Sequence, residues 1–341
     1  MELSDFYIPG GSRLFAILSK YDDYLADIER RPGYKAGDTL KLILPFLKAF
    51  GATDEGMRQF SRKHILLIPG AEEVLRDISS RMEAFLISTS YEPYIDALCD
   101  AVGFSKDKTF STPIRLEKYY LKDEEREKLI HLSEEIQGMK MMGWSETAQG
   151  LGDLAYEDQE AIRRLDRIFW KEIQGMGIGK ILFEVNPVGG KEKANAILLS
   201  LERTGNRLED VIYVGDSITD VEAFVLVRKG GGITISFNGN RYALRSAEIA
   251  CLSPTALPLS ILADVFQTGG REGIVEIVGH WGPDALTDFG IDPKLVRRLE
   301  SLPSEEHPKV YRITDENRAM LIQESEAFRK KVRGVEIGSL G

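Results

Sequence analysis

One stretch, Val211-Ile-Tyr-Val-Gly-Asp-Ser-Ile-Thr-Asp220, constrains the fold of this chain more than any other. Its first four residues are apolar and mostly β-branched or aromatic, which predicts a buried strand. Gly215 lets the backbone turn where that strand ends. Asp216 and Asp220 follow, and the apolar run from Val221 predicts a helix. Both carboxylates are therefore expected at the carboxyl end of a strand, the edge where open α/β sheets bind ligands.

The two carboxylates have two interpretations. Their hard oxygen atoms suit Mg²⁺, which is typically held by one or two carboxylates and otherwise by water and phosphate. Alternatively, Asp216 or Ser217 caps the helix, and Asp220 is favoured in the first helical turn by the helix dipole. This stretch alone leaves both interpretations open.

A second turn of the same kind follows the short apolar segment 84–87, a predicted strand. It contains Ser88, Thr89 and Ser90, and a helix is predicted from Tyr91. A hydroxyl in this position can donate a hydrogen bond to a phosphate oxygen, or it can simply cap the helix. The turn taken alone favours neither role.

Lys193 starts a third segment, the amphipathic helix predicted over 193–203, and can point toward the same sheet edge as Asp216. The alternative is an ordinary solvated lysine. Two glycine-rich stretches nearby do not match nucleotide-binding fingerprints. Gly175-Met-Gly-Ile-Gly179 precedes a strand-like segment, 180–185, instead of following one. Gly189-Gly-Lys191 lacks both the earlier glycine and the following Ser or Thr of a phosphate loop.

Alternating strands and helices of this length predict an α/β fold with a doubly wound parallel sheet. Further strands are predicted at 233–237 and, at the sheet edge, 248–252. The charged stretch 21–27 is interpreted as a solvated helix face, and Gly37-Asp38 as the cap of a helix over 39–50. The expected division is a helical segment 1–62, an α/β core 63–105 with 181–265, a helical insertion 106–180, and a helical extension 266–341 with a surface helix over 323–332.

Composition excludes several classes of partner. The 341 residues carry a net charge of −10, which argues against a nucleic acid or an anionic membrane as the main partner. A phosphorylated metabolite stays compatible, because a bound metal ion can supply local positive charge. No apolar run approaches the roughly 18 residues of a membrane span, and the N-terminal residues do not resemble a signal peptide. Two isolated cysteines and four scattered histidines fit a cytoplasmic protein without a zinc site.

Together these segments resemble the haloacid dehalogenase (HAD) superfamily, whose commonest members are Mg²⁺-dependent phosphatases. Val214-Gly-Asp-Ser-Ile-Thr-Asp220 is similar to the family's fourth motif, and Ser88, ending Phe85-Leu-Ile-Ser88, to the second-motif hydroxyl. Lys193 is similar to the third-motif lysine, with Lys191 as the alternative. The whole chain looks most like an archaeal branch that some genomes label as an accessory subunit of an energy-converting hydrogenase.

The resemblance implies a Rossmann-like HAD core with helical cap insertions and hydrolysis of a small phosphorylated metabolite through an aspartyl-phosphate. Mg²⁺ would be held by Asp216 and Asp220, while Lys193, Ser88 and Thr89 would bind the phosphate.

The family's nucleophile, the first Asp of a DxD motif after an N-terminal strand, has no counterpart here, because neither Asp5 nor Asp38 follows such a strand. The expectation is therefore a chain that starts after this motif. The alternative is a non-catalytic interaction subunit of an archaeal hydrogenase complex, which would have a protein partner.

Overall fold

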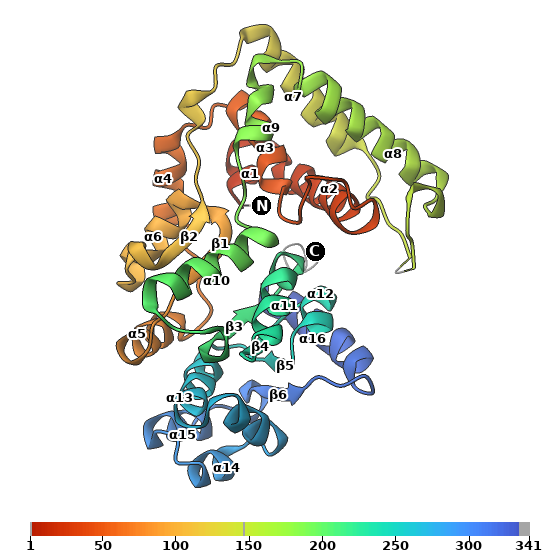
Figure 1. Cartoon of the computed structure of the whole chain (residues 1–341). Helices are drawn as coiled ribbons and strands as arrows, with labels where there is room; N and C mark the ends of the chain where they lie inside the picture. The colour runs from red at the N-terminus through yellow and green to blue at the C-terminus, as the bar shows by residue number, and fades with distance from the viewer. Residues whose placement is uncertain (1, 146, 334–341) are drawn as a thin grey trace.

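The structure is a computed structural model that describes residues 2–145 and 147–333. It has a mixed α/β fold in which most strand pairs are parallel. Figure 1 shows a helical layer in the upper part and the larger sheet with its helices in the lower part. None of the described helices has the length and apolar character needed to cross a membrane.

The larger sheet has the strand order β3-β4-β5-β6. Its first three strands are parallel, and the last is antiparallel: β3 Ile212–Gly215, β4 Ile233–Phe237, β5 Ile249–Leu252 and β6 Lys309–Arg312. Every residue of β4 and β5 is buried, as expected for parallel strands covered on both faces. Because β6 pairs with β5, the prediction that 248–252 is an edge strand is wrong.

The smaller sheet consists of β1 (Leu86–Tyr91) and β2 (Thr109–Thr112), which are parallel. Their register is irregular between Ile87 and Tyr91. Ser88 and Thr89 therefore belong to the end of the strand, whereas the sequence predicted a turn there. Helix α6 (Glu92–Val102) follows directly.

Helices cover both faces of the larger sheet. Alternate residues of β3 point to opposite faces, so Tyr213 packs with α10 (Lys191–Thr204) and α11 (Val221–Lys229). Its neighbour Ile212 packs with α13 (Leu257–Gly279), which contacts α5 (Ala71–Arg81). Both faces of β3 therefore lie in apolar surroundings.

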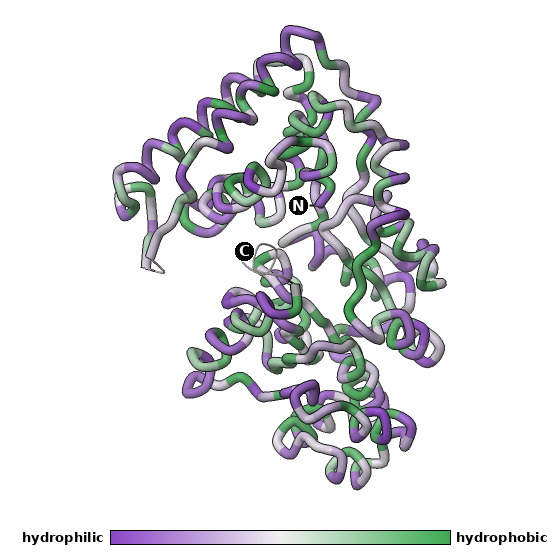
Figure 2. The backbone as a smooth tube through the Cα atoms, turned by 180° about the vertical axis from the view of Figure 1, so that it is seen from behind, coloured by the Kyte–Doolittle hydropathy of each residue, from purple (hydrophilic) through white to green (hydrophobic). Residues whose placement is uncertain are grey.

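The helical layer joins two segments that are far apart in the sequence. Residues of both segments share one hydrophobic core, which includes Leu18, Phe46, Leu132 and Phe169. The long helices α7 (Asp123–Gly138) and α8 (Tyr156–Arg167) alternate hydrophilic and hydrophobic positions (Figure 2), as helices with one buried face do. The helices of the layer are α1 Glu2–Tyr7, α2 Gly11–Asp23, α3 Thr39–Ala49, α4 Asp54–Lys63, α7 Asp123–Gly138, α8 Tyr156–Arg167 and α9 Ile181–Glu184.

Three local predictions in this layer are wrong. The strand-like segment 180–185 is helical, because α9 lies there. The charged stretch 21–27 is not a solvated face, since Asp22 and Asp23 are both only 4% exposed. The Asp38 side chain does not cap α3 and instead contacts Lys35 and Lys41.

The C-terminal region is not purely helical, because it contributes β6 to the larger sheet. It also contains α14 (Pro283–Asp288), α15 (Pro293–Glu300) and α16 (Arg318–Arg333). Helix α16 packs against α12 (Arg241–Ser246) and β5. The predicted surface helix 323–332 therefore has a buried face, with Ser325 fully buried and Arg329 3% exposed.

Candidate functional site

A cavity of about 430 Å³ lies where β1 and β3 end. Three segments of the chain line one side of it: the end of β1, the first turn of α10, and the turn after β3. All of the predicted site residues meet there, namely Ser88, Thr89, Lys193, Asp216 and Asp220. The alternative lysine, Lys191, is exposed and does not line the cavity. The tertiary structure thus brings together residues that the sequence places more than a hundred positions apart.

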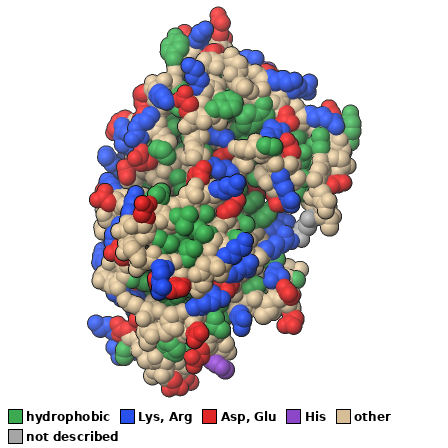
Figure 3. All heavy atoms as spheres, viewed as in Figure 1, with side chains coloured by type: hydrophobic (Ala, Val, Ile, Leu, Met, Phe, Trp, Pro, Cys, Tyr) green, Lys and Arg blue, Asp and Glu red, His purple; other side chains and the backbone are tan. Residues whose placement is uncertain are grey.

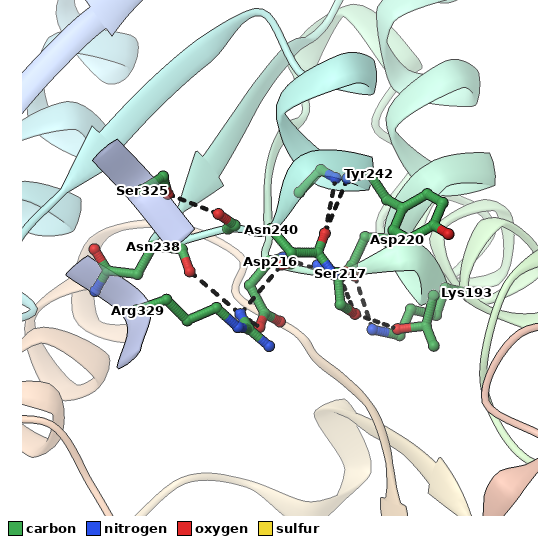
Figure 4. Close-up of polar contacts among 12 residues, drawn as sticks. Lys193, Asp216, Ser217, Asp220, Asn238, Asn240, Tyr242, Ser325 and Arg329 are labelled. Carbon is green, nitrogen blue, oxygen red and sulfur yellow. Dashed lines mark hydrogen bonds and ion pairs between the residues drawn. The ribbon is translucent and has the colours of Figure 1, made fainter. Parts of the chain in front are cut away.

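Asp220 is the centre of the hydrogen-bond network in Figure 4. One of its carboxylate oxygens, Oδ1, accepts hydrogen bonds from Lys193 Nζ and Tyr213 OH, both at 2.7 Å. The other, Oδ2, accepts from the backbone N–H groups of Asp216 and Ser217, both at 3.0 Å. With its side chain 2% exposed, Asp220 holds the turn in place through both oxygens.

This hydrogen-bond network explains why position 215 is a glycine. A Cβ atom at this position would lie 2.5 Å from Cγ of Asp220, which is closer than nonbonded carbon atoms can approach. The glycine is therefore needed for the close approach of Asp220 to the end of β3, in addition to the turn expected from the sequence.

Lys193 is almost completely buried, with 8% of its side chain exposed. An ammonium group carries three donor hydrogens, and among the described residues Asp220 is its one side-chain partner. Since Lys193 also lines the cavity, it can donate a further hydrogen bond to an anionic ligand. The interpretation of Lys193 as an ordinary solvated lysine is wrong.

Asp216 is paired with a residue that sequence analysis did not single out. Arg329 of α16 donates from Nη1 to Oδ2 of Asp216 and to the backbone oxygen of Asn238, the latter at 3.2 Å (Figure 4). The Arg329 side chain is 4% exposed, and that of Asp216 is 29% exposed. Arg329 stands in a charged helical segment, next to two lysines, and no local pattern distinguishes it from solvated neighbours.

The opposite wall of the cavity comes from the helical layer. It includes Asp22 and Asp23 at the end of α2 and Gly37 before α3. Asp22 accepts hydrogen bonds from Tyr34 OH at 2.7 Å and from Gly37 N at 2.9 Å. The apolar spacing of Leu18, Tyr21 and Leu25 was the sequence signal that this turn of helix has a buried side.

Burial disfavours the ionised form of these two carboxyls. It raises the pKa of Asp22 to about 7, against the opposing effect of the Tyr34 hydrogen bond. It raises the pKa of Asp23 to about 6, against the opposing charge of Lys20. Both groups therefore change charge in the neutral pH range, in the cavity that Lys193 and Asp216 also line.

The raised pKa of Asp22 makes stability depend on pH. The folded-state pKa lies above the unfolded value of about 3.9, so the stability that Asp22 contributes is complete below that value and is lost as pH rises through about 7. Between about pH 5 and pH 8 the wild type should lose roughly 2–3 kcal/mol relative to Asp22→Asn. Urea unfolding at both pH values measures this, and equal pH dependence in the two proteins would contradict the assignment.

Asp216 and Asp220 cannot both be ligands of one Mg²⁺ ion in this arrangement. Each oxygen of Asp220 already accepts two strong hydrogen bonds, so this residue has no oxygen left for a metal ion. Asp216 does line the cavity, although Arg329 contacts one of its oxygens. Within the described residues no group of three or more His, Cys, Asp or Glu side chains is placed to hold a metal. Of the predicted pair, Asp216 is therefore the residue to consider as a ligand for Mg²⁺, because it lines the cavity and Asp220 is fully engaged.

Comparison with known proteins gives one informative match. No protein-family model matches the chain, and no curated protein sequence matches it. The structure of gene product AF1437 from Archaeoglobus fulgidus is similar, with a TM-score of 0.80 and 27% sequence identity over 99% of this chain and 93% of that chain. This likeness extends over nearly the whole chain, so the α/β core and the helical layer belong to one shared fold. The name of that protein states no activity.

Proposed function

We propose that this protein is a HAD-like hydrolase whose two sheets belong to one doubly wound core, and that its cavity binds the phosphate group of a small phosphorylated metabolite. The observation that carries the proposal is the meeting of Ser88, Thr89, Lys193 and Asp216 in one cavity at the carboxyl ends of parallel strands. The proposed reaction is hydrolysis of the phosphate ester.

Two kinds of group would recognise the phosphate. Ser88 and Thr89 offer hydroxyl donors, and Lys193 offers a buried ammonium group whose position is held by Asp220. A cation held in a site of low polarity stabilises an anion far more strongly than one in water does. These residues would therefore bind and orient the phosphate, while the helical layer would cover it and limit the size of the metabolite.

The charges around the cavity are consistent with a metal ion as an additional component. Four carboxyls line it, Asp22, Asp23, Asp216 and Asp220, and two cations, Lys193 and Arg329. Mg²⁺ bound to Asp216 would offset this excess of negative charge and neutralise phosphate oxygens.

No carboxyl of the cavity is assigned as the nucleophile of the aspartyl-phosphate. Asp220, Asp216 and Asp22 are each held by the hydrogen bonds described above, and Asp23 accepts a hydrogen bond from Lys20 at 3.5 Å.

The first test is phosphate release from a panel of phosphorylated metabolites in the presence of Mg²⁺. Removing one preorganised donor typically lowers turnover by about 10²–10³-fold, so Lys193→Met should lower the rate by that order and Ser88→Ala by at least tenfold. Lys191→Met is the matched control on the same helical turn and should leave the rate unchanged. If the wild type releases no phosphate above the buffer rate, or if Lys191→Met reduces the rate as much as Lys193→Met, the proposed hydrolysis is wrong.

The second test is the effect of Mg²⁺ on thermal stability. A ligand present at about 100 times its Kd stabilises the folded state by about 2.7 kcal/mol, which should raise the melting temperature by several degrees. Asp216→Asn should remove this rise, whereas Asp210→Asn, an exposed carboxylate outside the cavity, should keep it. An equal rise in all three proteins would place the metal elsewhere.

A second candidate function is a non-catalytic HAD-like subunit that binds a protein partner, such as an archaeal hydrogenase complex. The pairing of Arg329 with Asp216 favours it, because a guanidinium group lies where a catalytic metal would be expected. Binding of Mg²⁺ and phosphate without phosphate release from any metabolite would support this candidate over hydrolysis.

A further inference from the structure

A second cavity, of about 670 Å³, lies among the helices of the helical layer, beside the end of β1. Its lining comes mainly from α1 to α4, from residues 66–69, and from the end of β1 with the start of α6. We call it the apolar cavity, and we call the cavity of the candidate site the polar cavity. The volume falls within the range of small-molecule binding sites, about 300–1,000 Å³.

The lining of the apolar cavity is mostly aliphatic and aromatic. Among the described residues that line it, Glu2 alone carries a charge. Figure 3 shows charged side chains of both signs over the outer surface, in contrast to this lining. The apolar side chains include Phe15, Ile43, Leu47, Met57, Phe60 and Leu67.

Three hydroxyl groups of the apolar cavity already have hydrogen-bond partners. Ser61 donates to the backbone of its own helix, α4, at 2.7 Å. Tyr91 OH donates to the backbone oxygen of Leu40 at 2.6 Å, and Tyr94 OH accepts from the backbone N–H of Leu66 at 3.3 Å. A sugar or a nucleobase here would lose its hydrogen bonds to water and find few replacements, which is unfavourable. The lining therefore favours a hydrocarbon group.

The apolar cavity adjoins the polar cavity. Phe15, Leu40 and Ser90 line both, and Ser90 lies two residues after Ser88 in β1. The hydrogen bond from Tyr91 to Leu40 joins the end of β1 to α3 at this junction. A phosphate group bound at the end of β1 would therefore lie next to the apolar walls.

Two adjacent leucines connect the apolar cavity with the solvent. Leu66 and Leu67 both line it, and they are 62% and 40% exposed. A bound hydrocarbon chain would remove part of this apolar surface from water, which is favourable. The lining thus extends from the solvent at these leucines to the polar cavity at Ser90.

We propose that the phosphorylated metabolite is a monoester of an apolar alcohol, with its phosphate in the polar cavity and its hydrocarbon chain in the apolar cavity. A cavity of about 150 Å³ holds a benzene ring, so 670 Å³ has room for roughly ten carbon atoms or more. Hydrolysis would consume one water molecule, break the phosphate ester bond, and release the alcohol and inorganic phosphate. This inference rests on the proposed function and names the class of its substrate.

Calorimetric titration of the purified full chain with octyl phosphate, below its micelle concentration, measures binding separately from turnover. Ethyl phosphate offers the same phosphate with a short chain, and ribose 5-phosphate offers it with a polar group. Each buried methylene strengthens binding about fourfold, so octyl phosphate should bind about 100-fold or more tightly than either. Equal affinity for the octyl and ethyl esters would overturn the inference, as would no binding of octyl phosphate with or without Mg²⁺.

Phosphate release from the same three esters distinguishes this inference from the proposed hydrolysis. Tight binding of octyl phosphate without release of phosphate would support the apolar cavity as a binding site and reject hydrolysis. Release from all three esters with equal kcat/KM would support hydrolysis and overturn the apolar substrate class.

Variants locate the hydrocarbon chain. Leu67→Glu puts a charge into the apolar cavity and should weaken octyl phosphate binding at least tenfold, while ethyl phosphate binding stays within about twofold. Ile43→Trp, which fills part of the cavity, should act in the same way. Leu198→Glu is the matched control for the charge, because Leu198 is 47% exposed and lines neither cavity. Equal melting temperatures would show that the variants fold, and equal octyl phosphate affinity in all three would overturn the placement of the chain.

Discussion

Asp220→Ala is expected to lower the free energy of unfolding by about 3–5 kcal/mol, the usual cost of removing one partner from a buried ion pair. The substitution leaves the Lys193 ammonium group without its 2.7 Å partner in a buried position. It also leaves Tyr213 OH and two backbone N–H groups of the turn without an acceptor. Urea unfolding measures the loss, and Glu202→Ala, which removes an exposed carboxylate from α10, is the control.

A double variant separates the charge from the other hydrogen bonds. If the unpaired ammonium group causes most of the loss, Asp220→Ala combined with Lys193→Met should be more stable than Asp220→Ala alone. A loss of less than about 1 kcal/mol in Asp220→Ala would mean that the turn is held by other contacts, because that is the range of exposed ion pairs.

Arg329→Met is expected to raise the affinity for Mg²⁺ by about 10- to 100-fold. Arg329 donates to the carboxylate that the metal would use, and a hydrogen bond to a charged group contributes about 1.5–3 kcal/mol. In the wild type the metal must displace this contact, whereas in the variant it does not. Calorimetric titration with Mg²⁺ measures the change.

The neighbouring residue provides the control for this experiment. Lys330→Met removes an equal charge from an exposed position of α16 and should leave the affinity unchanged. If Arg329→Met binds Mg²⁺ no more tightly than the wild type does, Asp216 is not the metal ligand. The proposed metal site then loses the only residue of the predicted pair that fits it.

The Asp220→Ala and Arg329→Met experiments test different parts of the proposed function. Asp220→Ala tests the architecture of the turn, which both candidate functions require. Arg329→Met tests whether that turn offers a metal site, which hydrolysis requires and an interaction subunit does not. A protein with a rigid turn and no metal affinity in either form would favour the interaction subunit over hydrolysis.

Local patterns in the sequence determined the strand-turn-helix units and the residues at their turns. The apolar run 211–214 and the helices after it needed no information about distant residues, and the predicted strands correspond closely to β3, β4 and β5. The strand predicted over 84–87 is displaced at both ends, because β1 begins at Leu86 and continues through Ser88 and Thr89 to Tyr91. Since parallel strands present their carboxyl ends at one edge, the sequence could also place Ser88, Lys193 and Asp216 at a common edge.

Only the tertiary structure decided which charged residues are buried and which strands have partners. Asp22 and Asp23 look like solvated helix residues until the tertiary structure buries them, and Arg329 is one of several basic residues until α16 packs against β5. The addition of β6 to β5 likewise depends on which distant segments meet. The physical reason is that periodicity reports which face of an element is apolar, whereas the group that covers that face comes from elsewhere in the chain.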